Sequence, residues 1–149
     1  MSGTGKSSVI QALAQRGYTA IDTDADGWHH WVHDVDGQPD WVWREDRIQA
    51  LLSKTDAPIL FVSGTVSNQV QFYPQFDHIV LLSAPTPVLL ERLATRTTNP
   101  YGKHPAELAR ILGHIETVEP LLRRAAALEV DTSAPLDQVV ETILRLVRA

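Results

Sequence analysis

Residues 1–8 read MSGTGKSS, and this stretch decides the expected fold class. It matches all but the first position of the pattern G-x-x-x-x-G-K-[ST], a glycine-rich turn that binds phosphate between a strand and a helix. Gly5, Lys6 and Ser7 supply the G-K-S, and residues 1–4 fill the four variable places. The first glycine and the strand before it would precede Met1. We therefore expect the natural chain to begin further upstream, with a short apolar strand that ends in glycine.

The chemistry of such a loop depends on its glycines and on the helix that follows. Backbone N–H groups approach phosphate oxygens closely where no Cβ intervenes, and a helix N-terminus favours the same anion. Lys6 would reach the β- and γ-phosphates, and the Ser7 hydroxyl would bind Mg²⁺. The alternative is a chance glycine-rich segment before an ordinary helix. The nucleotide-binding residues predicted here are Gly3, Thr4, Gly5, Lys6, Ser7 and Ser8.

Composition limits the other functions that the chain can have. The chain has 149 residues, a formal net charge of -5 and no cysteine. The negative charge argues against a general nucleic-acid binder, and the lack of cysteine excludes disulfides and thiolate sites. Because no apolar run approaches the roughly 20 residues of a membrane helix, we expect no membrane partner and a cytoplasmic location.

Helical and strand-like segments alternate along the sequence. Alternation of this kind is typical of an α/β protein with a parallel sheet covered on both faces. We expect one domain over residues 1–149, a three-layer parallel sheet, and a central first strand that is missing from this chain. Four strands are predicted, at residues 18–22, 58–64, 78–85 and 127–133. Helices are predicted at residues 6–17, 41–53, 86–96, 105 onward with a break at Pro120, and 134–149.

Two aspartates close the first predicted strand, in the sequence IDTD. Asp22 and Asp24 lie two residues apart, so on an extended chain both side chains point the same way. At the carboxyl end of a strand next to the phosphate loop, one could orient a magnesium-bound water. The other could accept a proton from an acceptor hydroxyl. The alternative is that these are turn acids that cap a helix near Asp26.

The order of four motifs resembles the shikimate kinase and nucleoside monophosphate kinase branch of P-loop proteins. These motifs are SGTGKSS, IDTD, ERLATR and EVDTSAP, and together they cover nearly the whole chain. The resemblance implies ATP- and Mg²⁺-dependent phosphorylation of a small acceptor. It also implies a five-stranded parallel sheet with the phosphate-loop strand in the middle. An acceptor-binding segment would cover residues 24–50, and a lid would cover residues 96–105.

The resemblance also suggests roles for single residues. Lys6, Asp22, Asp24, Arg92 and Arg96 would be catalytic, with Ser7 and Asp22 at the metal. Arg92 and Arg96 share a helix face and would stabilise the charge of the phosphoryl transition state. The alternative is a solvated face paired with Glu91. Asp131 and Thr132 in DTSAP would touch the adenine, or would merely cap the last helix.

Departures from the family patterns predict an acceptor that is neither shikimate nor a standard nucleotide. The glycine run that shikimate kinases carry after the third strand is reduced to Gly64, and the lid is short. Four tryptophans occur in the acceptor segment, at positions 28, 31, 41 and 43. Aromatic walls suit a ring-bearing or sugar ligand, although the same rings could pack the fold. The predicted acceptor-binding residues are Asp24, Trp28, Trp43, Arg44 and Gly64.

The sequence therefore predicts an ATP-dependent small-molecule kinase that is a monomer or a weak homodimer. Two alternatives stay open at this point. One is a P-loop domain that hydrolyses ATP or switches a partner, and the other is an inactive fragment.

Overall fold

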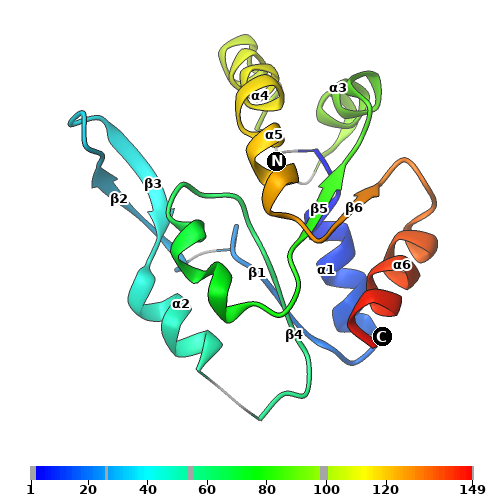
Figure 1. Cartoon of the computed structure of the whole chain (residues 1–149). Coiled ribbons are helices and arrows are strands. Elements are labelled where there is room, and N and C mark those ends of the chain that lie inside the picture. The colour runs from blue at the N-terminus through cyan, green and yellow to red at the C-terminus, as the bar shows by residue number, and fades with distance from the viewer. Residues whose placement is uncertain (1–2, 26, 54–55, 98–100, 149) are drawn as a thin grey trace. The chain divides into compact units, whose positions relative to one another are not determined.

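A computed structural model describes residues 3–25, 27–53, 56–97 and 101–148 (Figure 1). The chain divides into two compact units. Unit 1 comprises residues 1–9 and 78–149, and unit 2 comprises residues 10–77. Helix α1 (Lys6–Gln15) belongs to unit 1 in its first turn and to unit 2 beyond it. The prediction of a single domain stays a prediction, and each unit is described by itself.

Unit 1 is built on a pair of parallel strands with four further helices. Strand β5 (Val80–Ser83) pairs with β6 (Leu128–Asp131), with Ser83 opposite Asp131. The predicted break before Pro120 is confirmed, because Val118 separates two helices there. The four helices are α3 (Thr86–Thr95), α4 (Pro105–Thr117), α5 (Glu119–Ala125) and α6 (Leu136–Arg148).

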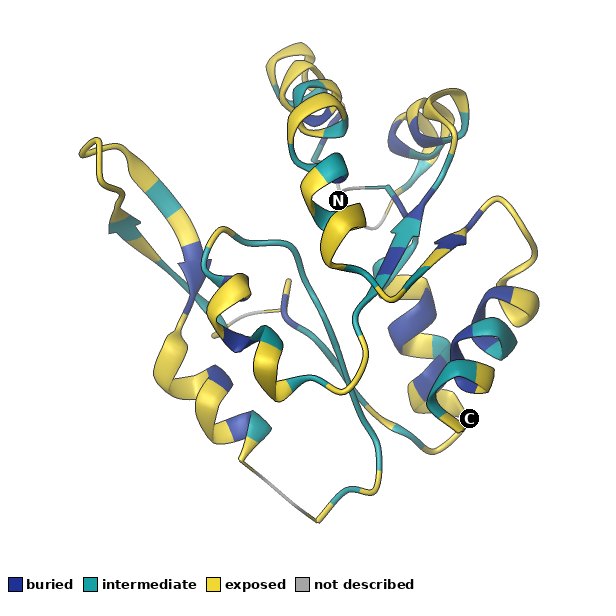
Figure 2. Cartoon of the chain, viewed as in Figure 1, coloured by how far each residue is buried: buried dark blue, intermediate teal, exposed yellow. Residues whose placement is uncertain are grey.

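The last helix, α6, buries one face of its side chains and exposes the other. Its buried side chains are Val139, Val140, Ile143 and Leu144, at the spacing of one helix face. Figure 2 shows this stripe as buried segments alternating with exposed ones along α6. The last helix that the sequence predicted is therefore confirmed, and its burial pattern shows that it is amphipathic.

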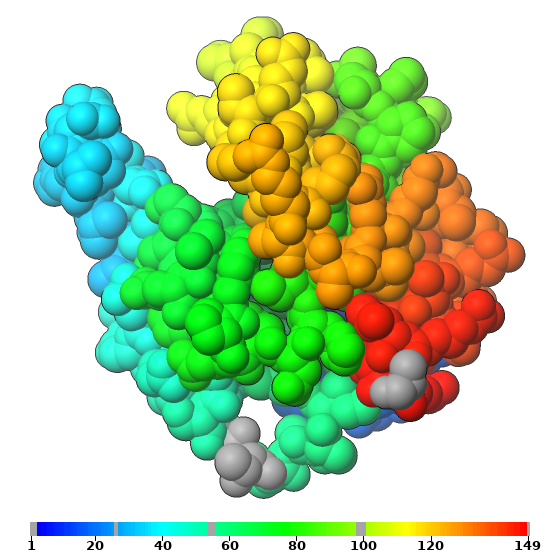
Figure 3. Space-filling view, in the orientation of Figure 1, coloured from blue at the N-terminus to red at the C-terminus, as the bar shows by residue number. Residues whose placement is uncertain are grey.

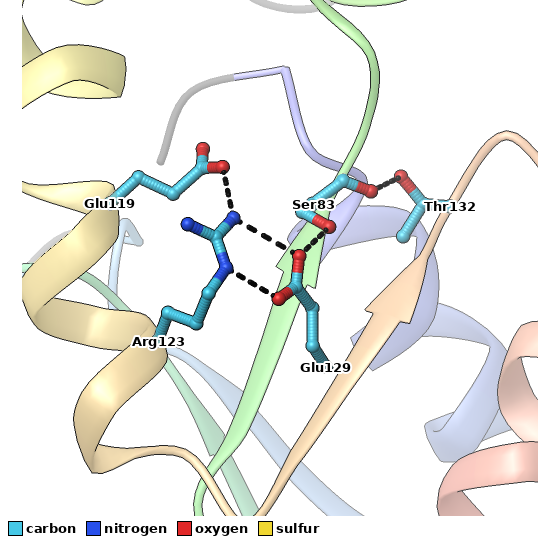
Figure 4. Close-up of polar contacts among 5 residues, drawn as sticks. All are labelled: Ser83, Glu119, Arg123, Glu129 and Thr132. Atoms are coloured by element: carbon cyan, nitrogen blue, oxygen red, sulfur yellow. Dashed lines mark hydrogen bonds and ion pairs between the residues drawn. The ribbon is translucent and has the colours of Figure 1, made fainter.

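A network of charged side chains ties helix α5 to the strand pair of unit 1 (Figure 4). Arg123 on α5 donates from Nε to Glu129 Oε1 at 2.6 Å and from Nη2 to Glu119 Oε1 at 2.8 Å. Ser83 donates from Oγ to Glu129 Oε2 at 2.8 Å. The hydrogen bonds from Arg123 and Ser83 lower the pKa of the Glu129 carboxyl from its ordinary value of 4.5. Glu129 thus links α5, β5 and β6 through its ionised form.

Because the folded-state pKa of Glu129 is lowered, its contribution to stability is present above pH 4.5 and is lost as the pH falls through the folded value. We expect Glu129→Gln to unfold at lower urea concentration than wild type at about pH 7, with the difference shrinking as the pH falls below the ordinary pKa of 4.5. Glu116→Gln, at an exposed position of α4, is the matched control. A difference between Glu129→Gln and wild type that is constant over this range would contradict the ionic role.

Unit 2 contains the second parallel strand pair. Strand β1 (Thr19–Asp22) pairs with β4 (Leu60–Ser63), so that Asp22 lies opposite Ser63. A hydrophobic core of Trp43, Ile48 and Phe72 lies in this unit. Ile48 comes from helix α2 (Glu45–Leu52), and Phe72 comes from the 3₁₀ helix η1 (Gln69–Gln75), which the sequence analysis did not predict.

An antiparallel hairpin lies in the predicted acceptor-binding segment, where the sequence predicted no strand and an earlier helix start. Strand β2 (His29–His33) pairs with β3 (Pro39–Trp43), so the helix prediction for residues 41–43 is wrong. Alternating tryptophan and valine suits a pleated strand, and β-branched and aromatic residues favour one. At the turn, Asp34 Oδ1 accepts the N–H groups of Asp36 and Gln38, both at 2.9 Å. Gly37 supplies the positive φ of 76° that this turn requires.

The fold class is mixed α/β. The four predicted strands are all present, and the hairpin brings the number in the described ranges to six. These strands form two parallel pairs and one antiparallel pair. The finer prediction of one three-layer sheet that lacks its first strand stays a prediction. Across the residues that the structure describes, each helix is too short or too polar to cross a membrane.

Candidate functional site

The glycine-rich loop has the backbone geometry of an anion-binding nest. Gly3 and Gly5 both lie in the left-handed region, at φ 79° and φ 94°, while Thr4 between them does not. Alternation of this kind turns successive N–H groups toward one concave side, where an anion can bind. Helix α1 begins at the next residue, Lys6, and its first bond runs from Val9 N–H to the Gly5 carbonyl at 3.0 Å. The loop therefore leads directly into a helix N-terminus, as a phosphate site requires.

Two predicted site residues, the catalytic candidate Arg92 and the adenine-contact candidate Thr132, lie beside this loop in unit 1. Arg92 on α3 donates from Nη1 to the Gly3 carbonyl at 3.1 Å and to Thr132 Oγ1 at 2.8 Å. Thr132 is buried, and a Cβ on Gly5 would lie 3.6 Å from Thr132 Cβ. Asp131 is exposed and accepts the N–H and the hydroxyl of Ser133, at 2.8 and 2.6 Å. The structure thus brings Gly3, Gly5, Arg92 and Thr132 together.

Arg96 and the lid start are also in unit 1. Arg96 is half-buried, and its Nη2 donates to the Tyr101 carbonyl. Burial lowers the pKa of the Arg96 guanidinium. Lys103 donates from Nζ to the Ala94 carbonyl at 3.0 Å, so it caps the end of α3. The middle of the predicted lid, residues 98–100, lies outside the described residues.

The aspartate pair lies at the carboxyl end of β1 in unit 2, but the chain is extended only as far as Asp22. Asp22 Oδ1 accepts the N–H of Asp24 at 3.0 Å, and the Asp22 carbonyl accepts the N–H of Ala25 at 3.1 Å. This is the turn that aspartate side chains commonly stabilise. Asp24 therefore does not continue the strand, and it is exposed whereas Asp22 is half-buried.

Thr23, between the two aspartates, is fully buried and fixes this turn. Its hydroxyl donates to the Ser63 carbonyl at 2.6 Å and accepts from Trp43 Nε1 at 2.9 Å. Gly64 lies against Thr23 and Trp43, because a Cβ there would be 2.3 Å from Thr23 Oγ1 and 3.1 Å from Trp43 Cζ2. Packing thus accounts for glycine at position 64. Trp43 is buried in the core, which fits the alternative that it packs the fold.

His29 joins the predicted acceptor residues Asp24 and Arg44. Arg44 donates from Nε to the His29 carbonyl at 3.3 Å. Burial lowers the pKa of the His29 imidazole, and the nearby Asp24 carboxylate opposes that shift. The His29 ring stacks on Trp41, with ring centres 5.4 Å apart and planes 12° apart. The structure therefore places His29 between a carboxylate, an arginine and an aromatic face.

We expect Asp24→Asn to lower the pKa of His29 further, because the carboxylate that favours the imidazolium would be lost. An NMR titration of the histidine ring protons would measure the shift. Asp36→Asn, in the hairpin turn, is the matched control and should leave the pKa of His29 unchanged. If Asp24→Asn had no effect on that pKa, Asp24 and His29 would not be neighbours.

The four tryptophans divide into buried and exposed groups. Trp31 and Trp41 lie opposite each other on the hairpin, 4.9 Å apart between ring centres, and are 67% and 47% exposed. Trp28 is half-buried and packs against the core of unit 2, with the Arg47 guanidinium 4.7 Å above its ring. In the space-filling view, the tip of the hairpin extends away from the rest of unit 2 (Figure 3). The exposed pair is thus available to a ligand.

The available donors suit magnesium and a nucleotide better than a softer metal. Ser7 supplies a hydroxyl and Asp22 a carboxylate, and both are the oxygen ligands that Mg²⁺ prefers. Among the described residues, no group of three or more histidine, aspartate or glutamate side chains gathers to hold a metal ion. Mg²⁺ commonly binds through one or two protein oxygens together with substrate phosphates and waters. Ser7 in unit 1 and Asp22 in unit 2 each stay a predicted Mg²⁺ ligand.

Sequence analysis missed three residues that the structure makes prominent. Thr23 holds the aspartate turn, His29 lies beside Asp24 and Arg44, and Glu129 links α5 to the strands. Only Thr23 carried a usable signal, since it lies between two motif aspartates. The contacts of the other two follow no spacing rule that the sequence would reveal.

The comparison with known families agrees with the loop geometry. The family model described as an AAA domain matches residues 1–113. Since this match covers more than half of the chain, the chain belongs to the AAA domain family. It is therefore a P-loop NTPase-like domain of the nucleotide-binding kind. The matched range includes the phosphate loop and Arg92 but ends before Thr132. A search of curated proteins gave no match.

Proposed function

We propose that this protein transfers the γ-phosphoryl group of ATP to a small-molecule acceptor, with Mg²⁺. The observation that carries the proposal is the loop at residues 3–8, which combines a glycine nest, a helix N-terminus, Lys6 and Ser7. Membership of the AAA domain family supports the nucleotide part of this proposal. The Asp-x-Asp turn and Arg96, which directly follows α3 in an extended conformation, resemble kinases of the shikimate type, and they support the transfer part.

In the proposed reaction, the loop N–H groups and Lys6 would hold the phosphates of ATP, and bound Mg²⁺ would neutralise part of their charge. Asp24, exposed in its turn, would accept the proton of the acceptor hydroxyl as that oxygen forms a bond to the γ-phosphorus. The bond from the γ-phosphorus to the bridging oxygen would break at the same time, so that ADP leaves. Arg96 stabilises the charge that spreads over the transferred group.

We further propose that the acceptor carries a ring and an anionic group. Trp31 and Trp41 offer exposed aromatic faces, and the stacked His29 extends them. Aromatic faces bind planar rings and the apolar faces of sugars. Arg44 is exposed directly after the hairpin, at the start of α2, where its guanidinium would suit a carboxylate or a phosphate.

The test is ATP consumption by the purified chain, with and without a panel of hydroxyl compounds that carry rings and acidic groups. The proposal expects ADP release that depends on an acceptor. Trp31→Ala and Trp41→Ala should then raise the KM for that acceptor and leave the KM for ATP unchanged. ADP release that is equal with and without every compound would favour a hydrolase or switch protein instead.

A further inference from the structure

Arg92 contacts two segments of unit 1 through one guanidinium group. From the last turn of α3, Nη1 donates to the Gly3 carbonyl at 3.1 Å and to Thr132 Oγ1 at 2.8 Å. Nη2 donates to the Thr132 carbonyl at 2.5 Å. Each of these acceptors is a neutral oxygen, and two of them are backbone carbonyls. The side chain therefore bridges the phosphate loop and the segment that follows β6.

Thr132, which accepts hydrogen bonds from Arg92, is itself held by the end of strand β5. It is buried, and its N–H donates to the Ser83 carbonyl at 2.8 Å. Its hydroxyl, while accepting from Arg92, donates to the same carbonyl at 3.2 Å. Ser83 ends β5, and Thr132 directly follows the end of β6. Arg92 therefore connects the loop to the carboxyl ends of a strand pair.

Helix α3 also packs on the loop with apolar side chains. A Cβ on Gly3 would lie 3.4 Å from Leu89 Cδ2 and 3.5 Å from Leu93 Cδ2. Leu89 and Leu93 are both buried and lie on the face of α3 that carries Arg92. One helix face thus supplies both the packing and the hydrogen bond that locate Gly3.

We propose that Arg92 is a positioning residue for the phosphate loop, and not the cation that meets the transferred phosphoryl group. This inference rests on the proposed nucleotide site. The C=O and N–H of a trans peptide point in opposite directions. By holding the Gly3 carbonyl, Arg92 sets the direction of the next N–H and thus preorganises the nest.

The hydrogen bonds that the Arg92 guanidinium already makes support this role. Both hydrogens of Nη1 are used by the Gly3 carbonyl and Thr132 Oγ1, and Nη2 uses one of its two on the Thr132 carbonyl. The Asp131 carboxylate is also near enough for Arg92 to help lower its pKa, after the larger effect of the Ser133 hydrogen bonds. Moving Arg92 to a phosphate would break these contacts. Arg96 then remains for the transition state.

The test compares Arg92→Lys, Arg92→Ala and Thr132→Val with wild type. Lysine keeps the charge but loses the planar fork, and valine keeps the shape of threonine but loses its hydroxyl. We expect Arg92→Lys and Thr132→Val each to weaken MgATP binding by about tenfold or more in calorimetry. Without nucleotide, amide hydrogen exchange at residues 3–8 should speed up. Arg145→Ala, at an exposed position of α6, should change neither property.

Both measurements need no acceptor, so they are independent of whether phosphoryl transfer is found. Faster loop exchange and weaker MgATP binding in Arg92→Lys, at an unchanged global unfolding midpoint, would support the positioning role over a general structural one. If Arg92→Ala and Arg92→Lys bound MgATP as wild type does and kept the loop exchange rates while turnover fell, Arg92 would act on the transition state. That result would overturn the inference. If Arg92→Ala failed to fold, Arg92→Lys and Thr132→Val would decide the question.

Discussion

Replacing Lys6 with alanine is expected to reduce phosphoryl transfer by at least about 10²–10³-fold. Lys6 begins α1 and follows the two glycines of the nest, so its ammonium group is the cation next to the expected phosphates. Removing a charge that stabilises developing negative charge costs more in the transition state than in the folded apo protein. We therefore expect the free energy of unfolding to change little.

Steady-state turnover and urea unfolding of the same preparations measure these two effects. Arg16→Ala is the matched control, since it removes a cation just beyond the other end of α1. It should retain wild-type turnover. A Lys6→Ala variant that turned over at the wild-type rate would show that the loop does not bind the reacting phosphates.

Gly64→Ala is expected to lower the free energy of unfolding by about 1–3 kcal/mol. The new methyl group would lie 2.3 Å from Thr23 Oγ1 and 3.1 Å from Trp43 Cζ2. Thr23 is fully buried and hydrogen-bonded to both Ser63 and Trp43, so it cannot move aside without breaking those bonds. Because the φ of Gly64 is not positive, the effect is steric and not a matter of backbone strain.

Gly113→Ala in α4 is a sharp control for this prediction. A Cβ at that position meets no atom within 4 Å, and alanine in a helix interior should stabilise by about 0.5–1 kcal/mol. A double-mutant cycle adds a second check, because Thr23→Ala removes Oγ1, the atom with which the new methyl group of Gly64→Ala would clash. The two changes together should destabilise less than their sum. Additive effects would mean that position 64 does not pack on Thr23.

The order of helices and strands could be predicted because local signals mark their ends. Gly17 follows α1 with a φ of 91°, Pro87 lies in the first turn of α3, and Pro120 lies in the first turn of α5. The hairpin could not be predicted in the same way. The sequence WVWREDRI carries apolar residues at spacings that suit a strand first and a helix later, and the change of period occurs at Arg44. Contacts with Asn68, which accepts the Trp43 N–H at 3.1 Å, help to fix the strand.

The motif residues of the candidate site could be predicted from the sequence, but the hydrogen bonds that connect them to the rest of the fold could not. Gly3, Gly5 and Lys6 follow a pattern whose spacing is set by the chemistry of phosphate binding, so one sequence is enough to find them. The contacts from Arg92 to Gly3 and from Trp43 to Thr23 join residues 89 and 20 positions apart. Sequence spacing cannot reveal contacts between residues so far apart. The hydrogen bonds by which Thr23 and Thr132 hold their neighbours are therefore visible only in the folded chain.

ATP that is radioactive at its γ-phosphate shows directly whether this protein is a kinase. Wild-type protein would be incubated with labelled ATP, Mg²⁺ and the acceptor panel, and Lys6→Ala would be treated in parallel. We expect wild type to move the label into an organic product, and Lys6→Ala not to do so. Label that appears only in inorganic phosphate, at the same rate with and without acceptors, would contradict the kinase proposal and identify a hydrolase.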